Sequence, residues 1–217
     1  MNVLSPMART HVAACARRLH AVGWVANHDG NVSMRVGKDR FLITPTATSK
    51  AEVTEANLVV VDGAGKVVEG TKKPPGELEL HLAAYRARPD CHAVVHAHPP
   101  FATAFGAARV ALPLPLPEAV VSLGRVPLAN FALPKTPQAI EAISSTLSQP
   151  EVEAVLLPGN GVLTVAADVA LAYLRMELVE HVAKIVQAAR ALGGVQELPD
   201  AVMADLLKAH VKTFPRK

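Results

Sequence analysis

The sequence predicts an α/β fold, with three α/β/α layers around a largely antiparallel central sheet. Two pairs of short apolar runs, each pair joined by a glycine-containing turn, predict β-hairpins in the N-terminal half, and hairpins build antiparallel sheets. Stretches with helical periodicity alternate with the later strands, as in a layered α/β domain. At 217 residues, half of them hydrophobic, the chain is long enough for a sizeable core. We therefore expect one domain over residues 1–217.

The N-terminal half begins with a helix and continues as two hairpins. Ser5 and Pro6 supply a capping hydroxyl and a proline at the first helical position, and Gly23 ends the helix after about Val22. The hairpin strands are expected at residues 27–35 and 41–46, and at residues 58–61 and 66–68.

The second half alternates strands with helices. Strands are expected at residues 93–98, 126–131, 152–157 and 162–165. Helices are expected from residue 77 and at residues 101–108, 136–147, 168–192 and 200–210, with an extended proline-rich loop at 112–117. Asp168 caps the longest helix, and Gly193–Gly194 closes it.

Candidate chemistry is concentrated in the stretch from Gly76 to Pro100. Its second half, residues 93–98, is typical of a buried strand that two prolines end, and side chains two apart in a strand point to one face. His96 and His98 therefore present two imidazoles side by side, a pair able to bind one divalent cation. The residues alone also fit two packed or surface histidines, so both interpretations stay open here.

Two further features accompany the histidine pair. Glu77 and His81 lie four residues apart, and so share a face near the start of their helix. At Gly30–Asn31, backbone N–H groups and an amide can converge on an anion. An ordinary hairpin turn explains the same two residues, and the sequence alone favours it.

Composition excludes several classes of protein. The net charge is only +3 and the basic residues are scattered, which argues against a nucleic-acid partner and leaves an anionic small molecule compatible. Cys15 and Cys91 have no CxxC partner and are expected to be reduced packing residues. A signal-peptide h-region and a membrane-length apolar run are both missing, so we expect no membrane partner and a cytoplasmic protein.

The pattern GELELH, followed by a helix and VVHAHPP, resembles the class II aldolase/adducin family, which includes the L-fuculose-phosphate aldolases. The likeness extends over most of the chain. It implies that His96 and His98 bind one divalent metal ion, zinc first and manganese, magnesium or cobalt as alternatives. It also implies that Glu77 is the catalytic acid/base and a possible further ligand. The family's assembly is a homotetramer with active sites between subunits.

The resemblance also extends to substrate binding. GNVS followed by ITPT resembles the family's phosphate-binding loops, which implies substrate contacts from Gly30, Asn31 and Thr46, continued by Ala47 and Gly76.

This sequence departs from the family pattern in three places around the substrate. Ala47 stands where the phosphate-binding aldolases have glycine, and Pro75–Gly76 stand where they have a serine pair. A tyrosine proton donor is expected near Glu118, and none is there, so Glu118 or water takes this role or the reaction differs. The phosphate of the substrate is therefore in question, and a carboxylate or an unphosphorylated sugar becomes an alternative.

The fourth departure concerns the metal. The family's third metal-binding histidine corresponds to Asn160, and an amide oxygen is a weaker and harder ligand than imidazole. Three outcomes stay open. Glu77 completes a site with Asn160 as a weak fourth group, the site takes a harder ion such as manganese or magnesium, or the metal is lost.

The leading hypothesis is a metal-dependent aldolase acting on a small hydroxy-carbonyl compound, such as a sugar or sugar phosphate, through a metal-stabilised enediolate. Glu77 would move the proton at carbon, for which burial should raise its pKa. An epimerase, dehydratase or decarboxylase on the same scaffold is the alternative, and a non-catalytic adducin-like binding module is the third.

Overall fold

The computed structural model describes residues 6–216, and Ser5, the expected cap of the first helix, lies outside them. The elements follow one another as α1 (Pro6–Ala21), β1 (Asn31–Gly37), β2 (Arg40–Ile43), the short 3₁₀ helix η1 (Lys50–Glu52), β3 (Val59–Val61), β4 (Val67–Glu69), α2 (Leu78–Ala87), β5 (Ala93–Ala97), α3 (Pro100–Ala108), α4 (Pro117–Leu123), α5 (Pro137–Ser148), β6 (Ala154–Leu156), β7 (Val162–Ala166), α6 (Val169–Arg190) and α7 (Asp200–Thr213).

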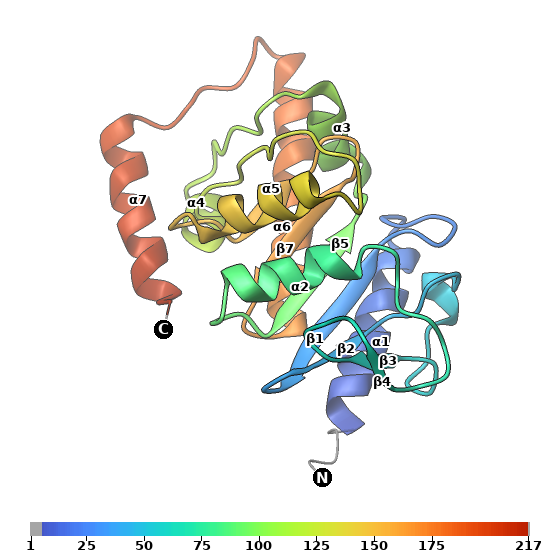
Figure 1. Cartoon of the computed structure of the whole chain (residues 1–217). Helices are drawn as coiled ribbons and strands as arrows, with labels where there is room; N and C mark the ends of the chain where they lie inside the picture. Colours follow the sequence, from blue (N-terminus) through green and yellow to red (C-terminus); the bar gives the residue numbers. More distant parts are fainter. Residues whose placement is uncertain (1–5, 217) are drawn as a thin grey trace.

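Within residues 6–216, seven strands form one sheet in the order β4-β3-β2-β1-β5-β7-β6 (Figure 1). Each neighbouring pair is antiparallel. The two hairpins expected in the N-terminal half are present as β1–β2 and β3–β4. The predicted fold class is confirmed.

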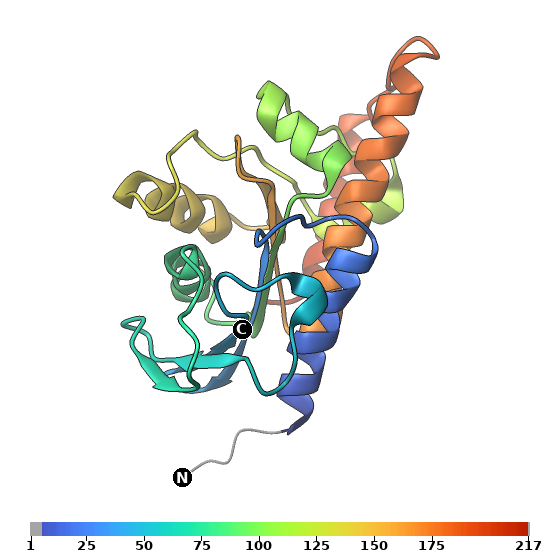
Figure 2. The same ribbon diagram turned by 90° about the vertical axis from the view of Figure 1, so that its right-hand side faces the viewer.

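The sheet is the middle of three layers (Figure 2). Helices α1 and α6 cover one face, and α2 and α5 cover the other. Alternation along β5 follows these layers, because Ala93, Val95 and Ala97 enter the core beneath α1 and α6, whereas Val94 enters the core beneath α2 and α5. His96 has the parity of Val94, so its ring faces the layer that contains Glu77.

The expectation of a strand at 126–131 was wrong. Only Leu128 bridges to Leu156, in parallel, and Pro127 has no N–H with which to extend the ladder. Helix α4 was not predicted either, although Pro117 occupies its first turn, where proline is favoured. The first strand begins at Asn31 rather than at residue 27, since residues 27–30 form a loop.

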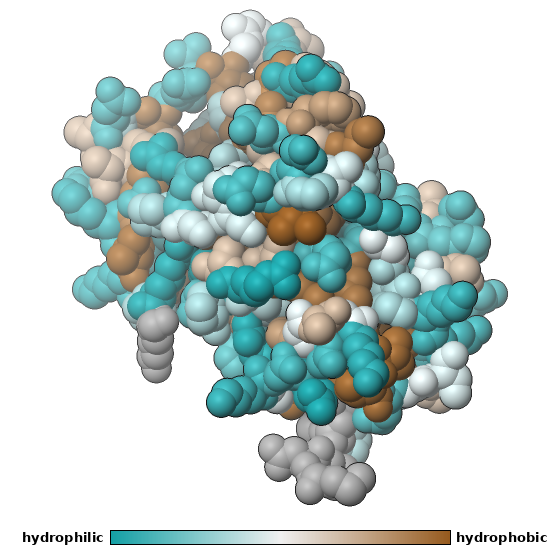
Figure 3. Space-filling view, viewed as in Figure 1, coloured by the Kyte–Doolittle hydropathy of each residue, from teal (hydrophilic) through white to brown (hydrophobic). Residues whose placement is uncertain are grey.

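The remaining helices agree with the sequence. Thr136 and Asp168 accept hydrogen bonds from backbone N–H groups at the starts of α5 and α6, as N-caps do. His181 is exposed, and Cys15 and Cys91 are free and buried. Of the helices described, none combines the length and apolar character needed to cross a bilayer. The face seen in Figure 3 is mostly hydrophilic, with apolar side chains in separate patches.

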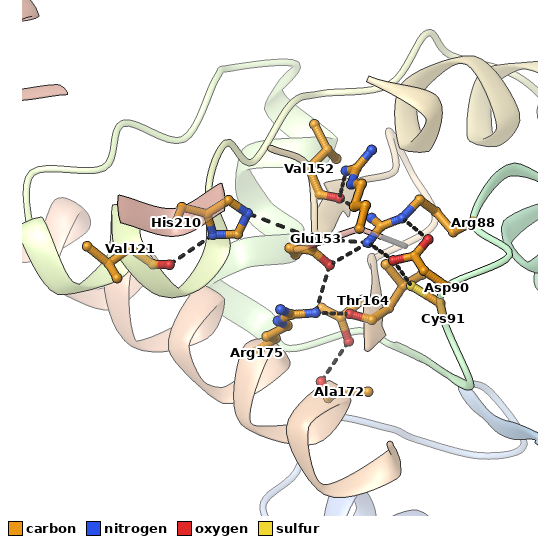
Figure 4. Close-up of polar contacts among 12 residues, drawn as sticks. Arg88, Asp90, Cys91, Val121, Val152, Glu153, Thr164, Ala172, Arg175 and His210 are labelled. Carbon is orange, nitrogen blue, oxygen red and sulfur yellow. Dashed lines mark hydrogen bonds and ion pairs between the residues drawn. The ribbon is translucent and has the colours of Figure 1, made fainter. Parts of the chain in front are cut away.

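A buried polar cluster connects α7 to the rest of the domain (Figure 4). Glu153, which precedes β6, lies 2.7 Å from Arg175 on α6 and 3.1 Å from Arg88 after α2. His210 on α7 hydrogen-bonds through Nδ1 to the Val121 carbonyl on α4, and its Nε2 lies 3.8 Å from Glu153. The cluster therefore links α7 to the β6 edge of the sheet.

Candidate active site

Four segments meet at the carboxyl end of β5. Helix α2 begins there with Glu77 as its N-cap residue, and the register of β1 places Asn31 directly opposite His96. The β6–β7 turn brings Asn160 to the same end, because Ala97 pairs with Val162. Glu77, Asn31 and Asn160 are far apart in the sequence, and they thus lie together at the end of β5 that carries His96 and precedes His98.

The Glu77 carboxylate is held from three sides. The Asn31 amide donates to Oε2 at 2.8 Å, and the Asn160 amide donates to Oε1 at 2.9 Å. His96 Nδ1 lies 3.2 Å from Oε2. Glu77 itself is half-buried, so these neighbours replace much of its water.

These contacts determine the charge of Glu77. Burial acts to raise its pKa, but the neighbouring His96 and the donating Asn160 amide outweigh burial and hold the pKa of this carboxyl well below its usual range. The expectation of a raised pKa was therefore wrong for this arrangement. Glu77 is a carboxylate at neutral pH, which suits a cation ligand, whereas the lowered pKa makes this carboxylate a weaker proton acceptor.

The two histidines lie next to each other, as the strand period predicted. Their ring centroids are 5.2 Å apart and the rings meet edge to face. His96 Nε2 lies 2.7 Å from the backbone carbonyl of Asn160, to which it donates as an N–H, so Nδ1 carries the lone pair in the neutral ring. Burial lowers the pKa of His96, but the Glu77 carboxylate raises it more strongly. Burial and the charge of His96 lower the pKa of His98.

The surroundings of two buried imidazole nitrogens, His96 Nδ1 and His98 Nε2, indicate whether these residues suit a cation. Among residues 6–216, His98 Nε2 is buried without a hydrogen-bond partner, and leaving a buried polar group unpaired costs about 1–3 kcal/mol. His96 Nδ1 is also buried, and it faces the Glu77 carboxylate. The 3.2 Å between His96 Nδ1 and Glu77 Oε2 is close to the ~3.3 Å that separates two ligands of a tetrahedral ion with 2.0–2.1 Å bonds. The residues fit a divalent cation.

The fit is incomplete in one respect. In the described part of the chain, no three His, Cys, Asp or Glu side chains are already arranged as a metal-binding group. The Asn160 side chain directs its NH₂ group toward Glu77, where an amide oxygen would repel the carboxylate. Asn160 as a weak ligand stays a prediction, and in this arrangement its side chain positions Glu77.

Of the expected substrate-binding residues, Asn31 contacts Glu77 directly and Gly76 precedes it in the chain. Thr46 and Ala47 are exposed, and Ala47 has φ of +50°, a left-handed conformation that favours glycine. Alanine thus occupies a backbone conformation that glycine adopts more easily. Gly30 also has positive φ, and a Cβ there would lie 3.1 Å from the His96 carbonyl.

Lys135 takes the space that a side chain at position 76 would fill. A Cβ on Gly76 would lie 2.7 Å from the Lys135 ammonium nitrogen. Lys135 is exposed, and none of the carboxylates between residues 6 and 216 forms an ion pair with it. A positive charge thus stands beside the position where serine was expected. Sequence reasoning missed it, because residue 135 is 59 positions from Gly76.

The residues considered as proton donors are not beside Glu77. Glu118 is exposed in the first turn of α4. Tyr85 is buried with its hydroxyl 2.9 Å from Ser33, and Tyr173 is buried against Trp24. Sequence reasoning also missed the polar chain from Tyr85 through Ser33 to His81 Nδ1, 2.7 Å from Ser33 Oγ, which runs behind the site.

Comparison with known proteins gives the same assignment from independent evidence. Residues 10–187 match the family described as class II aldolase and adducin N-terminal domain. The L-fuculose phosphate aldolase of Methanococcus vannielii is 34% identical over 163 residues, which cover 75% of this chain and 86% of that protein. A solved structure of an L-fuculose 1-phosphate aldolase superposes with a TM-score of 0.86 at 29% identity, covering 94% of this chain and 96% of that one.

A relative with a different activity is nearly as similar to this chain as the L-fuculose phosphate aldolases are. The 3-oxo-tetronate 4-phosphate decarboxylase of Haemophilus influenzae is 29% identical over 174 residues, covering 78% of this chain and 81% of that protein. With the sheet, the histidine pair and Glu77 in place, the matched residues make the assignment plain. The chain belongs to the class II aldolase and adducin family and is an aldolase-type enzyme.

Proposed function

We propose that this chain is a metal-dependent aldolase that cleaves or forms a carbon–carbon bond in a small hydroxy-carbonyl compound with an anionic group. The observation that carries the proposal is the Glu77 carboxylate held beside His96 by two amides, next to His98, whose buried Nε2 has no hydrogen-bond partner within residues 6–216. The similarity to L-fuculose phosphate aldolases supports this reaction class.

The cation belongs on His96 and His98, with Glu77 as a possible further ligand, and would act as a Lewis acid toward the carbonyl oxygen of the substrate. Zinc is the first expectation because imidazole and carboxylate are its usual ligands, with manganese, magnesium or cobalt as alternatives. Glu77 carries the proton at carbon. Glu77 is ionised, and the amides of Asn31 and Asn160 hold its carboxylate in place while it receives that proton. A homotetramer with active sites between subunits remains part of the proposal.

The proposal that the substrate carries an anionic group rests on Lys135. The phosphate-binding serines and glycine of the family pattern are replaced at Pro75, Gly76 and Ala47, and a lysine ammonium stands over Gly76 instead. A point charge attracts a phosphate or a carboxylate with less geometric demand than a ring of hydroxyls. Lys135→Ala should raise KM for anionic substrates about fivefold, since an exposed ion pair contributes up to ~1 kcal/mol, and should leave neutral substrates unchanged.

Decarboxylation of a 3-oxo acid is the second candidate, and one observation favours it. Both tyrosines of the chain, Tyr85 and Tyr173, are buried, and within residues 6–216 neither forms a hydrogen bond with Glu77. Aldol cleavage needs a proton transfer at the oxygen of the aldehyde fragment, whereas loss of carbon dioxide leaves no such oxygen. The similarity to the Haemophilus influenzae decarboxylase supports the same alternative.

The test combines metal content with product analysis. Purified wild type should carry about one divalent ion per chain by mass spectrometry, and His96→Ala should lose it. Wild type is then incubated with aldehydes plus dihydroxyacetone phosphate, dihydroxyacetone or glycolaldehyde, and separately with 3-oxo acids. A condensation product, lost about 10²–10⁴-fold in Glu77→Gln, is the expected result. Carbon dioxide release without condensation selects the second candidate, and a metal-free wild type with neither product refutes both.

A further inference from the structure

An acidic residue outside the expected site contacts the second histidine. Asp29 lies in the loop between Trp24 and β1, and its Oδ2 is 3.2 Å from His98 Nδ1. The other oxygen, Oδ1, accepts a hydrogen bond from the Ala26 N–H at 2.5 Å. The carboxylate is therefore fixed at one end by the backbone and directed at the imidazole with the other.

The loop that carries Asp29 is itself held in place. The Asp29 N–H donates to the Ala26 carbonyl at 3.0 Å, and the His98 N–H donates to the Trp24 carbonyl at 2.8 Å. Lys50, whose side chain is fully buried, donates through Nζ to the His28 carbonyl at 3.0 Å and to the Thr48 carbonyl at 3.1 Å. The buried Lys50 ammonium thus stabilises the loop beside Asp29 through two hydrogen bonds to backbone carbonyls.

The other nitrogen of the same ring has no partner. His98 Nε2 is buried without a hydrogen bond within residues 6–216. A neutral imidazole that donates Nδ1–H to a carboxylate keeps its lone pair on Nε2, and such a carboxylate fixes both tautomer and ring direction in metal sites. A carboxylate 3.2 Å from Nδ1, where Asp29 lies, favours the tautomer that leaves Nε2 free.

We propose that Asp29 is a positioning residue that fixes His98 for a divalent cation in a site that keeps two of its family's three histidines. The inference rests on the proposed function, because it requires that cation. A carboxylate behind His98 makes the ring a stronger donor and removes the entropy cost of orienting it. The competing explanation is that Asp29 only closes its own turn with Ala26.

The experiment measures metal affinity by competition with a chelator, for zinc and for manganese, in wild type and in Asp29→Ala and Asp29→Asn. Asp62 supplies the matched control, because its Oδ1 closes a turn on Ala64 and Lys66 in the β3–β4 hairpin, with no histidine beside it. Asp29→Ala should lose about 10–100-fold in affinity. Asp29→Asn should lose less, because its amide oxygen still accepts from Nδ1–H. Asp62→Ala should match wild type.

A spectroscopic readout on metal-free protein needs no activity. Long-range ¹H–¹⁵N correlation should show His98 protonated at Nδ1 in wild type and as a mixture of tautomers in Asp29→Ala. Unchanged affinity in Asp29→Ala, or protonation at Nε2 in wild type, overturns the proposal. So does an Asp29→Asn loss as complete as that of His98→Ala, which would make Asp29 a ligand. A wild type that binds no cation refutes the proposed function instead, and thermal unfolding of each variant verifies folding.

Discussion

Replacing Glu153 by glutamine tests how the C-terminal helix is attached to the domain. Glu153 is 1% exposed and pairs with two guanidinium groups that are 3% and 4% exposed, those of Arg88 and Arg175 (Figure 4). Arg88 keeps a second carboxylate at Asp90, 2.7 Å away, but among residues 6–216 Arg175 keeps only the Val165 carbonyl as a hydrogen-bond acceptor. Glutamine preserves the shape and leaves Arg175 as an uncompensated buried charge.

The expected loss of stability in Glu153→Gln follows from the unpaired charge of Arg175. Removing one partner of a buried ion pair costs about 3–5 kcal/mol of unfolding free energy. For a chain of this size each kcal/mol lowers Tm by about 2–4 °C, so Glu153→Gln should lower Tm by about 6–20 °C. Urea unfolding gives the free energy directly, and an unchanged m-value shows that the unfolding reaction is still the same.

An exposed pair on α7 provides the control. Asp205 lies 2.9 Å from Lys208, and both side chains are 77% exposed. Solvent screens such a pair, so Asp205→Asn should change stability by less than ~1 kcal/mol. If Glu153→Gln unfolds within 1 kcal/mol of wild type, as the control does, the buried cluster does not stabilise the domain and the argument fails.

Two other predictions concern the neighbourhood of the site. Ala47→Gly should raise the unfolding free energy by about 0.5–1 kcal/mol, because φ of +50° costs an L-residue about 1–2 kcal/mol and glycine returns part of this as chain entropy; equal or lower stability in urea contradicts this. Burial lowers the pKa of His81 to about 3, while the unfolded chain has the ordinary value of about 6.5. Between these two pKa values the unfolded state binds a proton on His81 and the folded state does not. The stability contributed by neutral His81 is therefore fully present above pH ~6.5 and falls as pH drops toward ~3. His81→Gln should flatten the pH dependence of urea unfolding over this window, and an unchanged slope contradicts the assignment.

Local sequence signals account for most of the fold. Both N-terminal hairpins, the buried strand β5 and the capped helices follow from periodicity and from turn and cap residues, which act within a few positions. The failures lie where tertiary context decides. Residues 126–131 have strand composition, yet they pair with β6 only at Leu128, because Pro127 interrupts the ladder at an edge.

The site was predictable to the extent that its residues belong to regular elements. Strand period placed His96 beside His98, and the start of a helix placed Glu77. Asp29 and Lys135 could not be found this way, because each reaches the site from a loop. The position of Asp29 depends on the hydrogen bond from the Ala26 N–H to its carboxylate, and that of Lys135 on a positive φ. No periodic pattern in the sequence encodes either feature.

Asn160 shows why a substitution should be judged from its neighbours. Considered as a missing histidine, it removes a ligand and weakens the case for a cation. In the structure its backbone carbonyl accepts from His96 Nε2 while its amide donates to Glu77, so one residue orients both a candidate ligand and the proposed acid/base. A histidine at 160 would keep the first contact, which is made by the backbone, and would exchange the second for a third imidazole. Asn160→His should therefore bind a cation more tightly, and it should also release Glu77 from one of its two amides.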